Sequence, residues 1–212
     1  MSRVTQAHID ARMAAIQDAA LTLFVRKGID GTTMQDIAAE AGISAGAIYR
    51  YFPSKAHLLQ AIFRHSIEQN RLLFDQAVAA SSSPMEALAN VGRIIQSGLK
   101  SEEMRLHAIL GLEAVLAAVR RPEPLAPELA RSHDAVTGRL EQLITGAQAA
   151  GELDPAVDAR ALAVLFQSVV VGLQVLSLDR EDPVPPEPVF HVIGRMLEGL
   201  APQARSLPES DC

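Results

Sequence analysis

Residues 31–59 read GTTMQDIAAEAGISAGAIYRYFPSKAHLL, and this stretch decides the fold. Thr33 followed by Asp36 is a helix-start pattern, because a side-chain oxygen caps free backbone amides while the acid faces the positive end of the helix. The pattern predicts a short helix over about 33–40. A tight turn follows, which Gly42 closes because glycine adopts the left-handed backbone conformation without strain.

Ser44 caps a second short helix, which we expect to run to about Tyr51. Two short helices joined by a turn of a few residues form a helix-turn-helix, in which the first helix holds the second at the angle needed to enter a DNA major groove. Ile37 and Ala38 on the first helix and Ile48 on the second supply the apolar contacts between them. The stretch therefore predicts a DNA-binding unit.

Longer amphipathic helices flank this unit. Apolar residues recur at three- and four-residue spacing over about 7–27, and Gly28 ends that helix. On the other side, Ser54 caps a long helix over about 55–79. Both neighbours are long enough to anchor the two short helices on a larger body.

The remainder of the chain also reads as helices, with no convincing strand. Prolines set the expected boundaries: Pro127 lies in a loop, Pro155 begins a helix, and the four prolines of 183–188 exclude helix there. The further helices are expected to begin near 84 and to span 102–120, about 129–147, 155–178 and 189–200.

The expected fold class is all-α with about nine helices in two domains. The first is an N-terminal three-helix domain with the helix-turn-helix, residues 1–53, which continues into the start of the fourth helix to about residue 65. The second, residues 54–212, is a C-terminal helical domain for regulation, ligand binding and dimerisation.

Charge is unevenly distributed between these parts. The net charge is −6, but residues 1–65 hold seven Lys and Arg against five Asp and Glu, and the rest of the chain holds twelve against twenty. A more basic module on an acidic body is the asymmetry expected of a DNA reader with a separate regulatory domain. A single cysteine, Cys212, and the lack of a signal-peptide pattern favour a cytoplasmic protein.

One segment, 161–178, carries no charge and approaches the length of a membrane-spanning helix. Polar residues are spread along it: Gln167, Ser168, Gln174 and Ser177. We therefore expect this helix to be buried between protein surfaces, and we expect no membrane partner. The almost wholly apolar helix over 102–120 is likewise expected in the centre of the molecule.

The N-terminal segment, about residues 9–65, resembles the DNA-binding domain of the tetracycline-repressor (TetR) family. The matching positions are Thr32-Thr33, Asp36-Ile37-Ala38, Ala41-Gly42-Ile43-Ser44, Gly46, Ile48-Tyr49, Tyr51-Phe52, Ser54-Lys55 and Leu58-Leu59. The resemblance implies an all-α homodimeric repressor that binds a palindromic operator and is released by a small hydrophobic effector. It implies no enzymatic activity, cofactor or metal.

The resemblance also implies roles for single residues. Arg50 is expected to read a base, because its guanidinium can span guanine O6 and N7, and Gly46 lets the helix backbone approach the DNA. Thr33, Ser44, Tyr49, Tyr51 and Lys55 are expected to hold phosphates. The whole expected DNA-binding set is Thr32, Thr33, Ser44, Ala45, Gly46, Ala47, Tyr49, Arg50, Tyr51 and Lys55.

Two positions depart from the family pattern. Ala45 stands where a lysine is frequent, and Ala47 where a threonine or serine is usual. Both alanines lose hydrogen-bonding capacity but can still touch thymine methyl groups. We therefore expect fewer polar base contacts and more reading of DNA shape.

Two further sets of residues are expected in the regulatory half. Ligand anchors are polar or core residues on the apolar helices: His107, Leu110, Glu113, Gln167 and Gln174. The dimer interface is expected on the last two helices, as a four-helix bundle with a second copy: Val169, Gly172, Val175, Leu176, Val189, Ile193, Met196 and Leu200.

Other functions find less support in the sequence. An enzyme is disfavoured, because the chain has no H-E-x-x-H, G-x-S-x-G or phosphate-loop motif and its six histidines are scattered. A ligand- or protein-binding module of the same fold that has lost DNA binding is the alternative, with Ala45, Ala47 and the acidic net charge in its favour. The sequence identifies neither the operator nor the effector.

Overall fold

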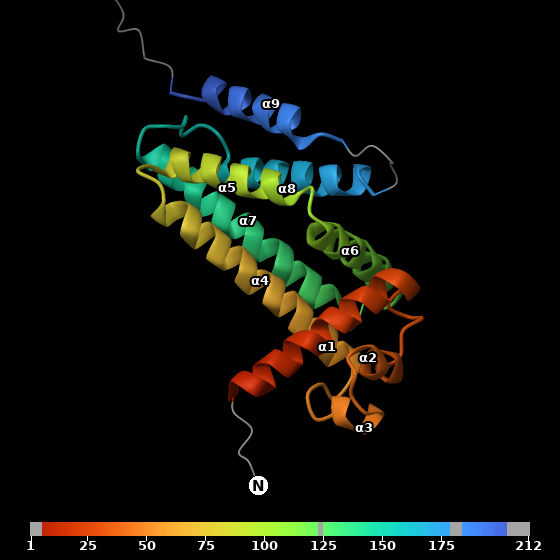
Figure 1. Ribbon diagram of the computed structural model, residues 1–212. Helices are drawn as coiled ribbons and strands as arrows, with labels where there is room; N and C mark the ends of the chain where they lie inside the picture. Colours follow the sequence, from red (N-terminus) through yellow and green to blue (C-terminus); the bar gives the residue numbers. More distant parts are fainter. Residues whose placement is uncertain (1–5, 123–124, 179–183, 203–212) are drawn as a thin grey trace, which may run out of the picture.

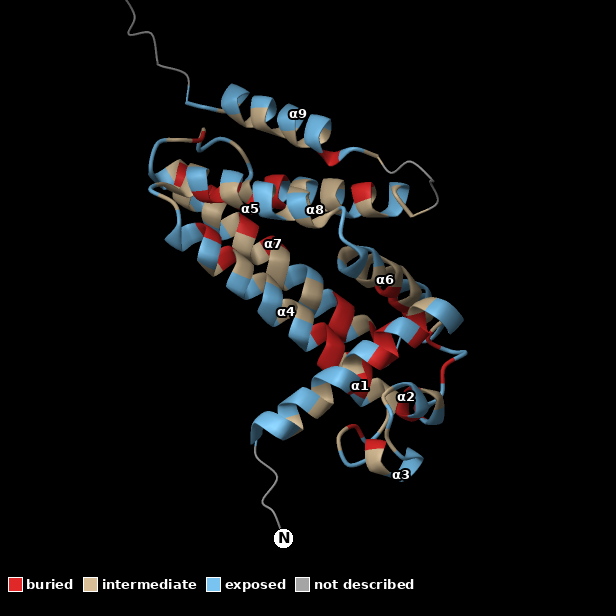
Figure 2. Cartoon of the chain, viewed as in Figure 1, coloured by how far each residue is buried: buried red, intermediate tan, exposed pale blue. Residues whose placement is uncertain are grey.

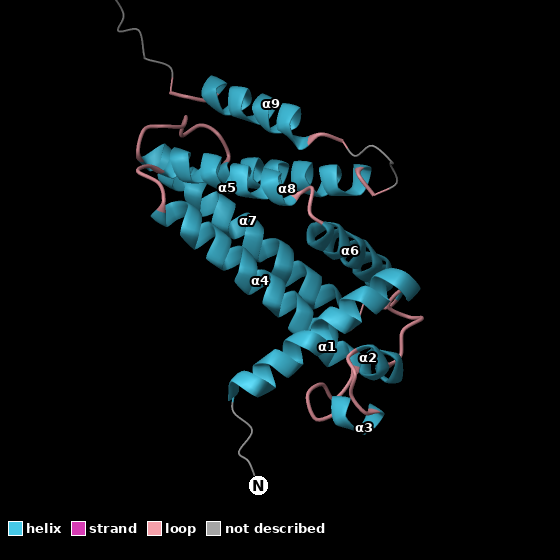
Figure 3. Cartoon of the chain, in the orientation of Figure 1, coloured by secondary structure: helices cyan, strands magenta, loops and turns pink. Residues whose placement is uncertain are grey.

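The computed structural model describes residues 6–122, 125–178 and 184–202, and in these ranges all regular structure is helical (Figures 1 and 3). The helices are α1 Gln6–Lys27, α2 Met34–Glu40, α3 Ala45–Ile48, α4 Lys55–Ala79, α5 Pro84–Gly98, α6 Glu102–Arg120, α7 Leu125–Ala149, α8 Ala159–Leu176 and α9 Pro186–Gly199. The all-α prediction is confirmed.

Helices α2, α4 and α5 begin where the sequence predicts them. Thr33 caps α2 in a capping box with Asp36, and Ser54 and Ser83 cap α4 and α5 through their side chains. Gly28 and Gly42, with φ of +75° and +65°, take the left-handed conformation expected after α1 and α2.

Three boundaries that rested on prolines are wrong. Helix α7 begins at Leu125, so that Pro127 lies in its first turn, and α9 begins at Pro186. The first-turn amides have no intrahelical acceptor, so a proline there removes no hydrogen bond. Conversely, α8 begins at Ala159, after a turn that contains Pro155, and it is Asp158 whose side chain caps it.

The helices form an elongated bundle with the short helices at one end. Figure 1 shows α1, α2 and α3 together at the lower end, while α4 and α7 run side by side from that end into the body. Helix α9 lies at the opposite end, where Phe190 packs close to Gly92 of α5. The N-terminal unit is thus presented at the tip of the molecule.

Two cores hold the bundle together. The first contains apolar side chains of α1 to α4 and continues into α6 and the start of α7, through residues such as Leu110, Ala114 and Leu129. The second joins α4, α5, α7 and α8 around Phe74, Ile144 and other buried side chains. The unit formed by α1, α2 and α3 therefore shares its core with α4, α6 and the start of α7, which gives a physical route for coupling between them.

Within the single chain, α6 is not a fully buried central helix and α8 is not covered between protein surfaces, contrary to expectation (Figure 2). On α6, only Leu110, Ala114 and Ala118 are buried, and Val119 is 78% exposed. On α8, the exposed large apolar residues are Val164, Leu165, Val171, Val175 and Leu176. By length and composition α8 is apolar enough to cross a membrane, with a mean hydropathy of 1.8, and 17% of it is buried.

Candidate nucleic-acid interface

The second helix of the helix-turn-helix is shorter than expected. Helix α3 ends at Ile48 instead of Tyr51, but the chain stays coiled, because the amides of Arg50 and Tyr51 donate to Ala47 O and Ile48 O at 3.2 and 3.0 Å. These are bonds between residues three apart, as in a 3₁₀ turn. The segment from Ser44 to Phe52 is therefore one compact helical unit rather than a regular two-turn helix.

Buried apolar contacts fix this unit against α2. The side chains of Ile37 and Ile48 are 0% exposed, and Ala38 and Phe52 are also buried in the first core. The turn between the helices is held by the amide of Ile43, which donates to Ala38 O at 2.9 Å. The predicted contacts between the two short helices are confirmed.

The outer side of the segment is accessible. Ser44, Ala45, Gly46, Tyr49 and Arg50 are exposed, with Tyr49 at 44%, and Ala47 and Tyr51 are half-buried. The structure thus brings seven of the expected DNA-binding residues together on one unit at the tip of the molecule (Figure 1). Arg50 is free to reach outward from it.

Gly46 has open space where a side chain would begin. A Cβ atom built there meets no atom of the chain within 4 Å. The fold itself therefore does not require glycine at this position, and its backbone is bare on the exposed side of α3. Ser44 occupies the N-cap position, but its side chain makes no cap hydrogen bond.

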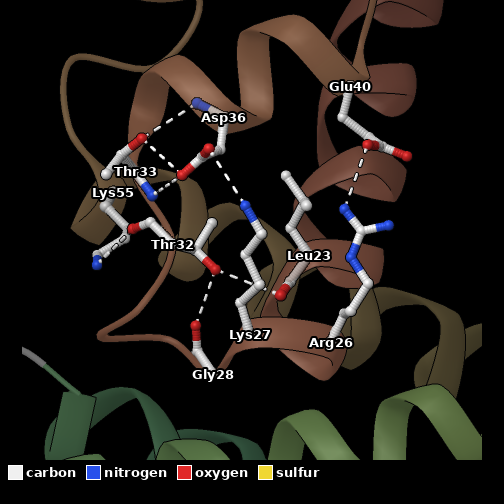
Figure 4. A network of polar contacts seen from close by, with 9 residues as sticks. All are labelled: Leu23, Arg26, Lys27, Gly28, Thr32, Thr33, Asp36, Glu40 and Lys55. Atoms are coloured by element: carbon white, nitrogen blue, oxygen red, sulfur yellow. Dashed lines mark hydrogen bonds and ion pairs between the residues drawn. The ribbon is translucent and has the colours of Figure 1, made fainter.

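A polar network secures the start of α2 (Figure 4). The Thr33 hydroxyl donates to Asp36 Oδ2 at 2.8 Å and accepts from the Asp36 amide, and the Thr33 amide donates to the same carboxylate at 3.0 Å. Lys27, in the last turn of α1, adds an ion pair to Asp36 at 3.3 Å. The hydrogen bonds from Thr33, with the help of Lys27, lower the pKa of Asp36 to about 2.

Two residues of the expected DNA-binding set point inward. Thr32 is 1% exposed, and its hydroxyl donates to Gly28 O at 2.8 Å and to Leu23 O at 3.3 Å. Lys55 is half-buried, with its Nζ 2.6 Å from Ile29 O and 2.9 Å from Thr32 O. The Thr32 side chain is therefore not available to DNA, and the Lys55 ammonium is engaged by backbone.

The expected ligand anchors have different surroundings in the structure. Leu110 is in the first core, His107 bonds Glu103 O one turn earlier on α6, and Gln167 of α8 accepts from Thr137 of α7. Gln174, also on α8, is half-buried. Glu113 alone of the set lines a hollow of about 400 Å³, which lies at the junction of α1, the α1–α2 loop and α6.

That hollow was not foreseen from the sequence. Besides Glu113, its charged lining residues are Arg26, Lys27, Asp30 and Arg120. Residues from α1 and α6 meet there only through the tertiary fold, so no local pattern marks the site. Arg26 and Lys27 are paired with Glu40 and Asp36 of α2, which leaves the hollow polar and open rather than apolar.

The expected interface residues divide into two groups. Val175, Leu176 and Met196 are exposed, whereas Val169, Gly172, Val189, Ile193 and Leu200 are half-buried. Leu200 packs against the second core of its own chain. The exposed members lie on α8 and α9, beside further exposed apolar residues of the same helices such as Val171 and Val192.

Two family models match the chain. Residues 16–62 match that of bacterial regulatory proteins of the tetR family, and residues 99–202 match the C-terminal domain of BetI-type transcriptional repressors.

Similar proteins are found along most of the chain. The transcriptional regulator YfiR of Bacillus subtilis is 28% identical over 84% of this chain and 87% of its own length. UidR of Escherichia coli is 28% identical over 78% of this chain and 83% of its own length. A solved structure described as a TetR-family regulator, from Rhodococcus sp., is 25% identical, superposes with a TM-score of 0.74, and covers 91% of this chain and 100% of that one. These relatives are transcriptional regulators, not enzymes.

Proposed function

The chain belongs to the TetR family of bacterial transcriptional regulators, and we propose that it is a dimeric repressor that binds a palindromic operator and leaves it when a small hydrophobic effector binds. In this proposal the protein acts in the cytoplasm. Its partners are double-stranded DNA, the effector and a second copy of the chain.

The exposed segment Ser44–Tyr51 at the tip of the molecule is the observation that carries the proposal. A major groove admits a helix, and Ala45, Gly46 and Ala47 are small enough to let the backbone come close. Tyr49 and Arg50 extend beyond them on the exposed side. We assign base reading to Arg50, and phosphate contacts to Ser44, Tyr49 and Tyr51. The hydroxyl and the amide of Thr33 both donate to Asp36, so we leave Thr33 out of this set.

The unpartnered apolar face of α8 and α9 supports the dimer. Five large apolar residues of α8 are exposed in the isolated chain, although surface helices normally place polar residues outward. Pairing α8 and α9 with their copies across a two-fold axis buries this face in a four-helix bundle. It also brings two recognition segments to two half-sites of one operator.

The shared first core supports control by an effector. α6 carries both apolar residues that pack against α1 and polar residues proposed to meet a ligand, such as His107 and Glu113. A ligand that binds better to one arrangement of these helices shifts the population of the DNA-binding arrangement. Gln167 and Gln174 on α8 are the other proposed polar anchors.

Selection of bound sequences from random double-stranded DNA tests this function. We expect an enriched inverted repeat, and an affinity for it whose logarithm falls linearly and steeply with the logarithm of the salt concentration. The selected duplex then serves to screen apolar compounds for release. Absence of any enriched sequence, with binding that varies little with salt, would favour the binding module without DNA recognition.

A further inference from the structure

Lys55 is the first residue of α4, and its ammonium is held by the loop between α1 and α2. Nζ donates to Ile29 O at 2.6 Å and to Thr32 O at 2.9 Å; Figure 4 shows the bond to Thr32. An ammonium has three N–H donors, and two of them are used here inside the protein. The half-buried side chain is thus directed along the loop, where two backbone carbonyls hold its ammonium.

The same loop is anchored to α1 by a different set of bonds. The Thr32 hydroxyl donates to Gly28 O and Leu23 O, and the Ile29 side chain is buried in the first core. Residues 28–32 are therefore attached to α1 through Thr32 and to α4 through Lys55. The next residue, Thr33, caps α2, so this loop sets where α2 begins.

Charge makes Lys55 well suited to this place. The carbonyl of Ile29 comes two residues after Lys27, the last residue of α1, and the C-terminus of a helix is the negative end of its dipole. Hydrogen bonds from a charged donor are stronger than those between neutral groups. A cation that bridges two carbonyls holds both at a fixed distance from itself. Because α4 packs against α1, α5 and α7, Lys55 ties the loop to the body of the molecule.

We propose that Lys55 is a positioning residue: its ammonium fixes the α1–α2 loop to α4 and thereby orients α2 and α3 for the operator, and it does not pair with a DNA phosphate. This inference rests on the proposed DNA-binding function. It assigns Lys55 a role different from the phosphate contact expected from the sequence.

Removal of the ammonium tests the proposal. The variants are Lys55→Met and, as a matched control with the same loss of charge, Lys100→Met, whose lysine forms an exposed ion pair with Glu187. Binding is measured on the selected operator and on a random duplex, over a range of salt and at a temperature where circular dichroism shows both variants folded.

We expect Lys55→Met to weaken operator binding about tenfold or more, to change random-duplex binding much less, and to keep the wild-type salt slope. Lys100→Met should match wild type throughout. A salt slope shallower by about 0.9 for each subunit, with equal losses on both duplexes, would instead show a phosphate contact and overturn the proposal. Unchanged operator affinity in folded Lys55→Met would overturn it as well.

A labelling experiment on the wild-type protein covers the case in which Lys55→Met does not fold. The chain has three lysines, Lys27, Lys55 and Lys100, so reductive methylation is readily mapped. We expect Lys55 to react at least about tenfold more slowly than Lys100, both without and with operator. A Lys55 that reacts as fast as Lys100 until operator protects it would contradict the proposal. Failure of the wild type to bind any DNA would count against the proposed function. The labelling rates of the free protein would still show whether the Lys55 ammonium is held by the α1–α2 loop.

Discussion

At the scale of the residue, Gly46 is a glycine that the fold itself does not require. Open space surrounds its Cβ position, and its neighbours Ala45 and Ala47 are small. Alanine in place of helical glycine gains about 0.5–1 kcal/mol, because the unfolded chain loses less freedom on folding. Packing therefore does not explain glycine at this position, and in the proposed function the bare backbone lets the DNA come close.

The variant Gly46→Ala is expected to separate stability from binding. It should unfold at the same or a slightly higher denaturant concentration than wild type, yet bind the selected operator about tenfold or more weakly. Gly42→Ala is the matched control, because φ is +65° there and alanine is strained. That control should lose stability by about 1 kcal/mol. Wild-type operator affinity for Gly46→Ala would count against close approach at α3.

Prediction from sequence was uneven among neighbouring residues. Thr33 was correctly expected as a cap, because its spacing to Asp36 is a local pattern. Thr32 and Lys55 were expected at DNA, yet both have partners inside the protein. Lys55 lies 23 residues from Thr32 in sequence, so only the tertiary fold reveals this contact.

At the scale of the element, α2 depends on the charge of Asp36. The pKa of this carboxyl is lowered from 3.8 to about 2, chiefly by hydrogen bonds from Thr33. A carboxyl whose pKa falls on folding stabilises the folded state above its ordinary pKa. The stabilisation is lost as pH falls from about 4 toward 2.

We expect Asp36→Ala to have a lower free energy of unfolding than wild type at neutral pH. The difference between the two free energies should be constant down to about pH 4 and shrink toward pH 2. Denaturant unfolding of both proteins between pH 2 and 7 measures it. A difference that stays the same down to pH 2 would mean that the ionised carboxylate does not stabilise α2.

The starts of α2 and α4 were predictable from their hydroxyl caps, whereas the starts of α7, α8 and α9, for which prolines were the guide, were not. The hydroxyl caps Thr33 and Ser54 were identified from sequence, whereas Ser44 stands at an N-cap without a cap hydrogen bond. Pro127 and Pro186 were assigned to loops although they lie in first helical turns. A proline pattern alone does not distinguish the residue before a helix from its first turn, because both tolerate the missing amide.

At the scale of the whole molecule, the described part of the chain leaves the apolar face of α8 exposed. The sequence predicted α8 as a helix buried between protein surfaces, but few of its residues are buried in the isolated chain. Apolar periodicity in a sequence predicts that one face of a helix is covered. It does not distinguish cover by the same chain from cover by a second subunit. The proposed two-fold axis resolves the difference by covering this face with a second copy.

An arginine in that face is expected to separate the subunits. Val175→Arg places a charge on α8 without a partner, so we expect dimer dissociation to become easier by about a hundredfold or more and operator binding to be lost at the same protein concentration. Val78→Arg, on α4, is the control, since the two valines are 39% and 43% exposed. Sedimentation should show the control as a dimer. A dimeric Val175→Arg would move the interface away from this part of α8.

The central claim is that two copies of the segment Ser44–Tyr51 read two major-groove half-sites, with Arg50 on a guanine in each. Interference by guanine N7 methylation on the selected operator, with wild type and Arg50→Ala, measures this directly. For wild type we expect interference at two half-sites whose centres lie about 34–36 Å, or a multiple of that, apart on one side of the duplex. Arg50→Ala should lose the signal at one guanine in each half-site and bind more weakly by about 1–3 kcal/mol. Interference in a single stretch without symmetry, or the same guanines affected with and without Arg50, would contradict the claim.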